Sequence, residues 1–164
     1  MTGRPRQRAV TVRVNGEEVT GLVEPRTLLV DFLREKAQLT GTHTGCNQGW
    51  CGACTVLVGP ERDSTRACLT LAVQADGVEV TTVEGVQDSD GTLSALQQAF
   101  IEHFAFQCGF CTPGFIALGT EIVAEATGGA VFSRDELKRR LAANICRCTG
   151  YQGIVAAIES VINA

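Results

Sequence analysis

The chain has 164 residues, of which 45% are hydrophobic, 20% charged and 5% aromatic, so it is long enough to bury a core without disulfide bonds. Its formal net charge of −4 argues against a nucleic-acid partner, because no excess of Lys and Arg is present to neutralise phosphates. No apolar stretch approaches the roughly 20 residues that span a bilayer, and no apolar region of an export signal follows the basic start, residues 1–8. We therefore expect a cytoplasmic protein that begins with a frayed tail.

The first half of the sequence predicts short strands around one helix. Valines alternate with polar residues on either side of Asn15-Gly16, a pair that favours a hairpin turn. Thr27 is expected to cap a helix whose apolar residues follow at helical spacing. The elements expected here are a hairpin over residues 9–23, a helix over 27–36, strands over 55–58 and 78–82, and a turn over 59–66. Together they predict a compact α+β unit.

Beyond residue 84 the pattern becomes helical after a polar, linker-like stretch. Thr112-Pro113 predicts a cap followed by proline at the first helical position, and Ser133 with Glu136 predicts a capping box. Helices are expected over residues 93–104, 112–127, 133–143 and 153–163. Four helices with short connections predict a bundle. The chain therefore divides into an α+β half, residues 1–84, and an all-α half, residues 85–164.

Eight cysteines are the strongest chemical signal, and in a cytosolic protein clustered cysteines indicate metal rather than disulfides. Four of them form the N-terminal cysteine set: Cys46, Cys51, Cys54 and Cys68. One short loop supplies three of these and the fourth follows after 13 residues, which is the spacing of plant-type [2Fe–2S] ferredoxins. Gly45, Gly49 and Gly52 allow close approach of the backbone. Structural zinc sites usually bring paired ligands, so zinc fits this set poorly.

The other four form the C-terminal cysteine set: Cys108, Cys111, Cys146 and Cys148. By spacing alone zinc remains an alternative here. Both halves of the set end in Cys-Thr shortly before a predicted helix, so helix N-termini are expected to face an anionic cluster. His43 and His103 are the only histidines, and we expect neither to be a ligand because each set already has four thiols.

Three segments resemble the small iron–sulfur subunit of the xanthine oxidase family of molybdenum hydroxylases. They are the loop from Gly45 to Cys54, Gln-Cys-Gly-Phe-Cys-Thr-Pro-Gly at 107–114, and Asn-Ile-Cys-Arg-Cys-Thr-Gly at 144–150. The resemblance extends from about Val10 to the C-terminus and includes the order of all eight cysteines. It implies one [2Fe–2S] cluster in each set. It also implies an N-terminal β-grasp domain like that of plant-type ferredoxins, followed by a four-helix bundle domain.

The resemblance further implies a path for electrons. Gln107 matches the glutamine that hydrogen-bonds the molybdopterin cofactor, and Cys148 matches the cluster ligand beside the pterin. Electrons would pass from molybdenum to the C-terminal set, then to the N-terminal set and on to FAD. Because the sequence ends at Ala164, molybdopterin and FAD are expected on a large and a medium partner subunit, in a dimer of heterotrimers.

A free-standing two-cluster ferredoxin is the alternative, which Gln107 and the helical half disfavour. Two features depart from the family pattern: the connection between Cys54 and Cys68 is longer, and Trp50 stands where a smaller residue is common. Two interpretations remain open: these features alter the surface that meets the flavin subunit or the potential of the first cluster, or they are a tolerated hairpin extension and an aromatic that covers the loop. The substrate is not set by this chain.

Overall fold

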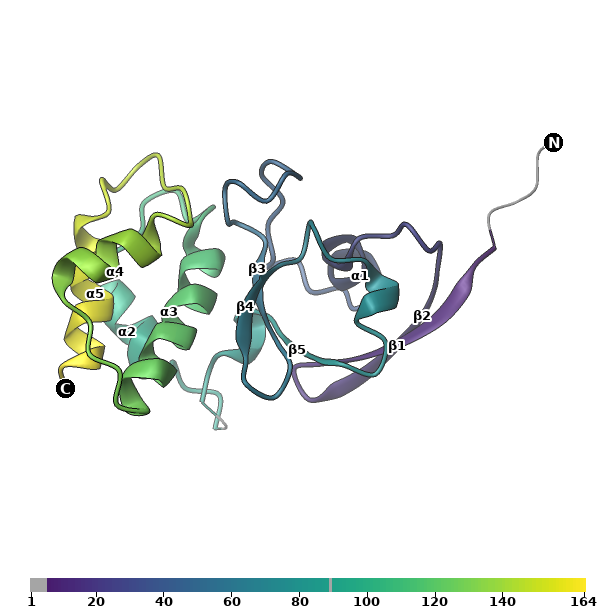
Figure 1. Cartoon of the computed structure of the whole chain (residues 1–164), viewed down its shortest axis with the longest axis horizontal. Helices are drawn as coiled ribbons and strands as arrows, with labels where there is room; N and C mark the ends of the chain where they lie inside the picture. Colours follow the sequence, from purple (N-terminus) through teal and green to yellow (C-terminus); the bar gives the residue numbers. More distant parts are fainter. Residues whose placement is uncertain (1–5, 89) are drawn as a thin grey trace.

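The computed structural model describes residues 6–88 and 90–164, in which a strand-rich half and a helical half lie side by side (Figure 1). The predicted tail falls partly outside this range, since residues 1–5 are not described. The strands are β1 (Arg8–Val14), β2 (Glu17–Val23), β3 (Thr55–Val58), β4 (Asp63–Arg66) and β5 (Glu79–Thr81). The helices are α1 (Leu29–Glu35), α2 (Ala95–Glu102), α3 (Thr112–Thr127), α4 (Arg134–Leu141) and α5 (Gln152–Ile162), with 3₁₀ turns at Ala72–Gln74 and Val83–Gly85.

The five strands form one mixed sheet in the order β2-β1-β5-β3-β4. The predicted hairpin is confirmed: β1 and β2 pair antiparallel, and Asn15 (φ 52°) and Gly16 (φ 86°) make the left-handed turn between them. Strand β5 runs parallel to β1 and antiparallel to β3. Helix α1 packs on this sheet through Leu29, Phe32 and Leu33, all fully buried. The predicted mixed character of this half is therefore confirmed.

Two predictions in this half are wrong. Helix α1 begins after Leu28 rather than at a Thr27 cap, because the backbone around Thr27 is bonded to a neighbouring segment: Thr27 O accepts from Ala72 N and Leu29 N donates to Thr70 O. Residues 63–66 form strand β4, not a turn, since they pair in register with β3. Tertiary pairing outweighs the polar composition of β4.

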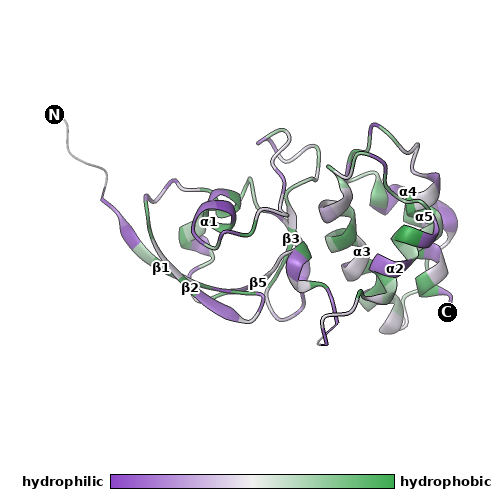
Figure 2. Cartoon of the chain, turned by 180° about the vertical axis from the view of Figure 1, so that it is seen from behind, coloured by the Kyte–Doolittle hydropathy of each residue, from purple (hydrophilic) through white to green (hydrophobic). Residues whose placement is uncertain are grey.

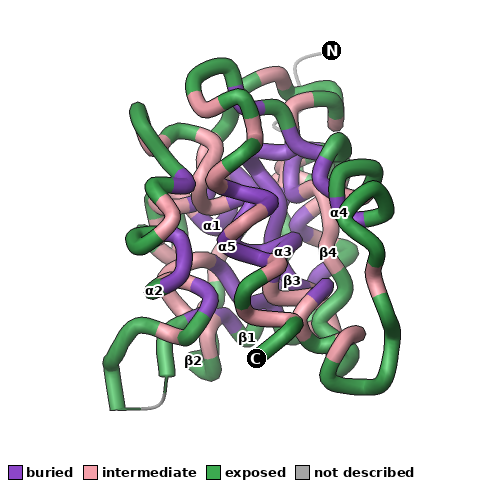
Figure 3. Tube along the Cα trace, turned by 90° about the vertical axis from the view of Figure 1, so that its left-hand side faces the viewer, coloured by how far each residue is buried: buried purple, intermediate pink, exposed green. Residues whose placement is uncertain are grey.

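The helical half has its own core, in which α5 packs against α2, α3 and α4. Figure 2 shows hydrophobic segments on α3 and α5, and Figure 3 shows the buried segments at the centre of the molecule. The largest fully buried side chains here are Phe100, Phe115, Ile122, Leu137, Leu141, Ile154 and Ile158. None of the helices within residues 6–88 and 90–164 is long and apolar enough to cross a bilayer.

Polar caps begin two of these helices, and the cap of α4 was predicted from the sequence. Ser133 and Glu136 form the expected capping box of α4, and Ser94 with Gln97 forms one at α2. The prediction for α3 is wrong by one residue, because Cys111 rather than Thr112 is the N-cap, although Pro113 lies in the first turn as expected. A candidate metal ligand therefore stands at the start of the longest helix.

The two halves meet along α3, which packs against β3 and β4. The carboxylate of Glu121 on α3 accepts hydrogen bonds from the backbone N and the hydroxyl of Ser64 on β4, at 2.7 and 2.9 Å. The same carboxylate accepts from Arg140 of α4. The contact fixes the position of the C-terminal cysteine set relative to the N-terminal one.

Candidate metal centres

The N-terminal cysteine set is brought together by the hairpin of β3 and β4. Cys54 precedes β3 and Cys68 follows β4, and the backbone N of Ala67 donates to Cys54 O at 3.2 Å. Both residues are buried. Burial raises the pKa of Cys54 to about 11, and the thiol of the neighbouring Cys68 contributes to this rise. Strand pairing thus delivers the one cysteine that lies far from the others in the sequence.

The loop before β3 aims backbone donors at sulfur. The N–H groups of Cys51 and Gln48 each donate to Cys46 Sγ at 3.4 Å, and these bonds lower the pKa of Cys46 to about 7. Gly49 (φ 77°) and Gly52 (φ 73°) give the loop the left-handed turns that this geometry needs. Such N–H groups stabilise thiolates and the added charge of a reduced cluster.

The C-terminal cysteine set comes from two loops of the helical half. Cys108 and Cys111 flank Gly109 (φ 82°) just before α3, whereas Cys146 and Cys148 lie between α4 and α5. Cys148 Sγ and Cys108 Sγ are 3.5 Å apart. Burial and the adjacent Cys146 raise the pKa of Cys111 to about 12. Each thiol of one loop therefore faces a thiol of the other.

A hydroxyl and a phenol hold the second of these loops. Thr149 donates to Cys146 Sγ from its backbone N and its hydroxyl, at 3.4 and 3.1 Å. The hydroxyl of Tyr151 accepts from Cys146 N and donates to Asn144 O, both at 3.0 Å. Its ring packs edge-on against Phe115 of α3. Tyr151 itself is left-handed (φ 67°), so the backbone turns sharply from the cysteines into α5.

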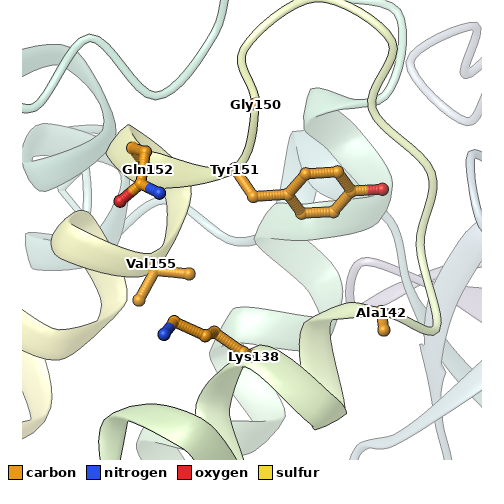
Figure 4. Close-up of a pocket in the computed structure, with 6 residues that line it drawn as sticks. All are labelled: Lys138, Ala142, Gly150, Tyr151, Gln152 and Val155. Atoms are coloured by element: carbon orange, nitrogen blue, oxygen red, sulfur yellow. The ribbon is translucent and has the colours of Figure 1, made fainter.

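Tyr151 also borders a surface pocket of about 300 Å³. Figure 4 shows its lining, which comes from the end of α4 and the start of α5: Lys138, Ala142, Gly150, Tyr151, Gln152 and Val155. The ammonium group of Lys138 is paired with Asp135 at 3.1 Å. The pocket lies beside the cysteine loop and contains no thiol.

The eight sulfurs fit two [2Fe–2S] clusters better than single metal ions. They lie in four pairs: Cys46 with Cys51, Cys54 with Cys68, Cys108 with Cys148, and Cys111 with Cys146. Each iron of a four-cysteine [2Fe–2S] cluster takes two protein thiolates, which pairs of thiols can supply. A structural zinc ion instead needs four ligands around one centre.

The two histidines make contacts in different parts of the chain. His43 stacks on Phe110 with ring centroids 4.9 Å apart, and its Nδ1 lies at 2.8 Å from Phe110 O. His103 ends α2 as its C-cap. His43 thus links the N-terminal loop to the loop that carries Cys108 and Cys111, a contact that the sequence did not suggest.

Gln107 and Cys148, the two predicted pterin contacts, are both exposed. Phe104 and Phe106 lie beside Gln107 in the chain and are also exposed, Phe104 at 85%. Their predicted roles toward molybdopterin stay predictions. The surroundings suit a contact surface, because several large apolar side chains of one segment, Phe104, Phe106 and Phe110, are exposed, and grouped apolar exposure marks interaction sites.

Sequence reasoning missed the residues that connect the two sets. Arg66 donates to the backbone oxygens of Gly49 and Ala143, which belong to different halves. Ile145 N donates to Cys51 O at 2.8 Å. The buried side chain of Asn144 lies against Gly52. The only sequence signal was the position of Asn144, two residues before a cysteine.

Comparison with known proteins identifies both halves. The 2Fe-2S iron-sulfur cluster binding domain matches residues 12–76, and the [2Fe-2S] binding domain matches residues 82–159. Caffeine dehydrogenase subunit gamma of Pseudomonas sp. (strain CBB1) is 48% identical over 153 residues, which cover 93% of this chain and 89% of that protein. The nicotine 6-hydroxylase small subunit of Paenarthrobacter nicotinovorans is 48% identical over 149 residues, covering 91% and 86%.

A solved structure agrees with these relatives. The crystal structure of quinoline 2-oxidoreductase from Pseudomonas putida 86 superimposes with a TM-score of 0.87 at 45% identity, covering 96% of this chain and 95% of that one. The family models, the relatives and the solved structure therefore agree along nearly the whole chain. The chain belongs to the small iron–sulfur subunits of the xanthine oxidase family of molybdenum hydroxylases.

Proposed function

We propose that this chain is the electron-relay subunit of a heteromeric molybdenum hydroxylase, passing electrons from a molybdopterin centre to FAD. The observation that carries the proposal is the contact between the two cysteine sets, joined by the hydrogen bond from Ile145 N to Cys51 O. Two redox centres whose ligand loops touch are suited to pass electrons within one subunit. A [2Fe–2S] cluster, when bound, supplies a one-electron redox step.

The chain's own residues would hold and tune these groups. The N-terminal set, Cys46, Cys51, Cys54 and Cys68, would hold one cluster, and the C-terminal set, Cys108, Cys111, Cys146 and Cys148, the other. N–H groups of the first loop and the hydroxyl of Thr149 donate to sulfur and so favour the thiolate form. In this proposal the first set lies in a β-grasp, ferredoxin-like domain, residues 1–84, and the second in a four-helix bundle, residues 85–164.

The two sets would face different partners. Gln107 and Cys148 are exposed beside Phe104 and would contact molybdopterin on a large subunit. At the N-terminal set, Trp50 is 75% exposed and Leu69 61%, and this apolar surface would meet a medium, FAD-binding subunit. A dimer of such heterotrimers and a cytoplasmic location stay predictions.

A free-standing carrier is the second candidate, and the same apolar surfaces disfavour it. A diffusing electron carrier would leave Trp50 and Phe104 in water, whereas a subunit covers them. The caffeine and nicotine enzymes above are by name multi-subunit, which supports the subunit proposal. In this proposal the large subunit, and not this chain, determines the substrate of the complex.

The first test is the content of the complex purified natively through this chain. About four iron atoms per chain, two for each cluster, together with stoichiometric molybdenum and FAD, are expected. Iron without molybdenum or flavin after gentle isolation would instead support the carrier.

The order of transfer is tested with Cys108→Ser in the same complex. Substrate electrons should no longer reduce FAD, while the electron paramagnetic resonance (EPR) signal of the N-terminal cluster remains. Normal flavin reduction would contradict the order. Replacement of Gln107 by Ala should lower turnover and molybdenum content without loss of iron, and unchanged values would contradict its proposed role.

A further inference from the structure

One buried polar side chain lies between the two cysteine sets. Asn144 is 1% exposed and precedes Cys146 by two residues. A Cβ added to Gly52 would lie 1.9 Å from Asn144 Oδ1, and one added to Gly114 would lie 3.2 Å from Nδ2. The amide therefore fills the space between the loop of Cys51 and the first turn of α3, which follows Cys111.

The amide has no hydrogen-bond partner within the described residues, at either Nδ2 or Oδ1. Buried polar atoms in native proteins are nearly always bonded, and an unpartnered one calls for a specific explanation. No hydrogen bond within the described residues explains why an amide stands at position 144. If the side chain served only to fill space, an apolar side chain would do so without the free-energy cost of burying an unbonded amide. The geometry points to a partner that is not part of the chain.

The position of Asn144 also bears on the connection between the sets. The next residue, Ile145, donates its N–H to Cys51 O at 2.8 Å, and Cys146 follows directly. Covalent bonds and this single hydrogen bond thus form a continuous route from Cys51 to Cys146. A side chain that fills the gap beside the route keeps its two ends at a fixed separation.

We propose that Asn144 is a positioning residue for electron transfer between the two cysteine sets, and that its amide hydrogen-bonds a small group outside the chain. That group is a buried water molecule, which can accept from Nδ2 and donate to Oδ1, or a sulfide of a bound cluster, which can accept from Nδ2. The inference rests on the proposed relay function, because it concerns transfer between two loaded sets. Loss of the amide loosens the contact of Gly52 with the segment 144–146 while all eight cysteines remain.

The test compares Asn144→Leu and Asn144→Ala in the whole complex with Asn163→Leu, an exposed asparagine at the end of α5. Three quantities are measured: iron per chain, the EPR splitting caused by magnetic interaction between the two reduced clusters, and the rate of electron transfer between the clusters after rapid reduction. Iron should be unchanged in all variants. Both Asn144 variants should alter the splitting and slow the transfer several-fold, whereas Asn163→Leu should match the unmodified protein.

Reduction potentials identify the group that Asn144 bonds. Loss of a hydrogen bond to sulfide lowers the potential of that cluster, because the bond stabilises the reduced state. Loss of a hydrogen bond to water should leave the reduction potentials of both clusters unchanged, while the EPR splitting between them changes. If Asn144→Leu fails to load iron, the smaller Asn144→Ala decides. Wild-type splitting and transfer rate in the iron-loaded variants would overturn the inference, whereas an unmodified chain without two reducible clusters would overturn the relay function itself.

Discussion

The carbonyl oxygen of Gly52 lies 2.1 Å from the position that a Cβ atom on Gly114 would occupy. These two glycines bring the N-terminal cysteine loop and the start of α3 into backbone contact. A side chain at position 114 would have to displace backbone rather than a flexible side chain. The close approach of the two cysteine sets therefore depends on the absence of a Cβ atom at one helical position.

Gly114→Ala should destabilise the protein although alanine favours a helix. The helical gain is about 0.5–1 kcal/mol, and overpacking against backbone costs roughly 1–3 kcal/mol, so a net loss is expected. Gly119→Ala on the same helix is the control, because its Cβ would meet only the side-chain ends of Leu96 and Ile158 at 3.0 and 3.3 Å. Denaturant unfolding measures both. Equal stability of the two variants would contradict the contact.

Tyr151→Phe should loosen the loop that carries Cys146 and Cys148. The variant keeps the ring against Phe115 but leaves Cys146 N and Asn144 O without the phenol that bridges them. Loss of a partner for such groups costs about 1–3 kcal/mol. Thermal unfolding should show the loss, and iron should be released from the C-terminal set sooner. Ser160→Ala, which removes a hydrogen bond from a hydroxyl within α5, is the control. An equal loss of stability in this variant would contradict a special role of Tyr151 in holding the loop.

Arg66→Lys should weaken the junction between the halves although the charge is kept. The guanidinium of Arg66 donates to Ala143 O at 2.6 Å, to Gly49 O and to the hydroxyl of Thr55. A lysine cannot reproduce this fork, and because Ala143 is exposed to water, a loss of about 0.5–1.5 kcal/mol is expected. Arg26→Lys, whose side chain pairs only with the nearby Glu24 at the surface, should change unfolding little. A tolerated Arg66→Lys would show that the fork is dispensable.

The cap of α4 gives a pH-dependent contribution. Hydrogen bonds from the Ser133 hydroxyl and backbone N hold the pKa of Glu136 below its usual value. Because the folded pKa is depressed, the stabilisation is complete above the unfolded pKa of about 4.3 and is lost as pH falls through the folded value.

A carboxyl-carbon chemical-shift titration of Glu136 measures this directly. Ser133→Ala should return the pKa toward its usual value and remove that part of the acid dependence, whereas Ser160→Ala should leave the pKa where it is. A pKa of Glu136 that is unaffected by Ser133→Ala would show that the cap is not its cause.

The sequence by itself determined the elements whose signals are local. The hairpin around Asn15-Gly16, strand β3, the cap at Ser133 and the first-turn proline Pro113 depend on turn chemistry, alternation and capping, which act over a few residues. The clustering of Cys46, Cys51 and Cys54 in one loop was also evident from the sequence, because ligand spacing within a loop is a local property. The family resemblance extended this to the cofactors and the relay role.

Tertiary structure decided what depends on contacts between distant segments. Strand β4 reads as a turn until its pairing with β3 is known, and the start of α1 is shifted by bonds to residues 70–72. The roles of Gly114, Arg66 and Asn144 exist only because α3 packs on β3, across more than 50 residues of sequence. A sequence pattern reports which side chains are present along one segment. The separation of the two cysteine sets is a property of two packed halves, and only their packing sets it.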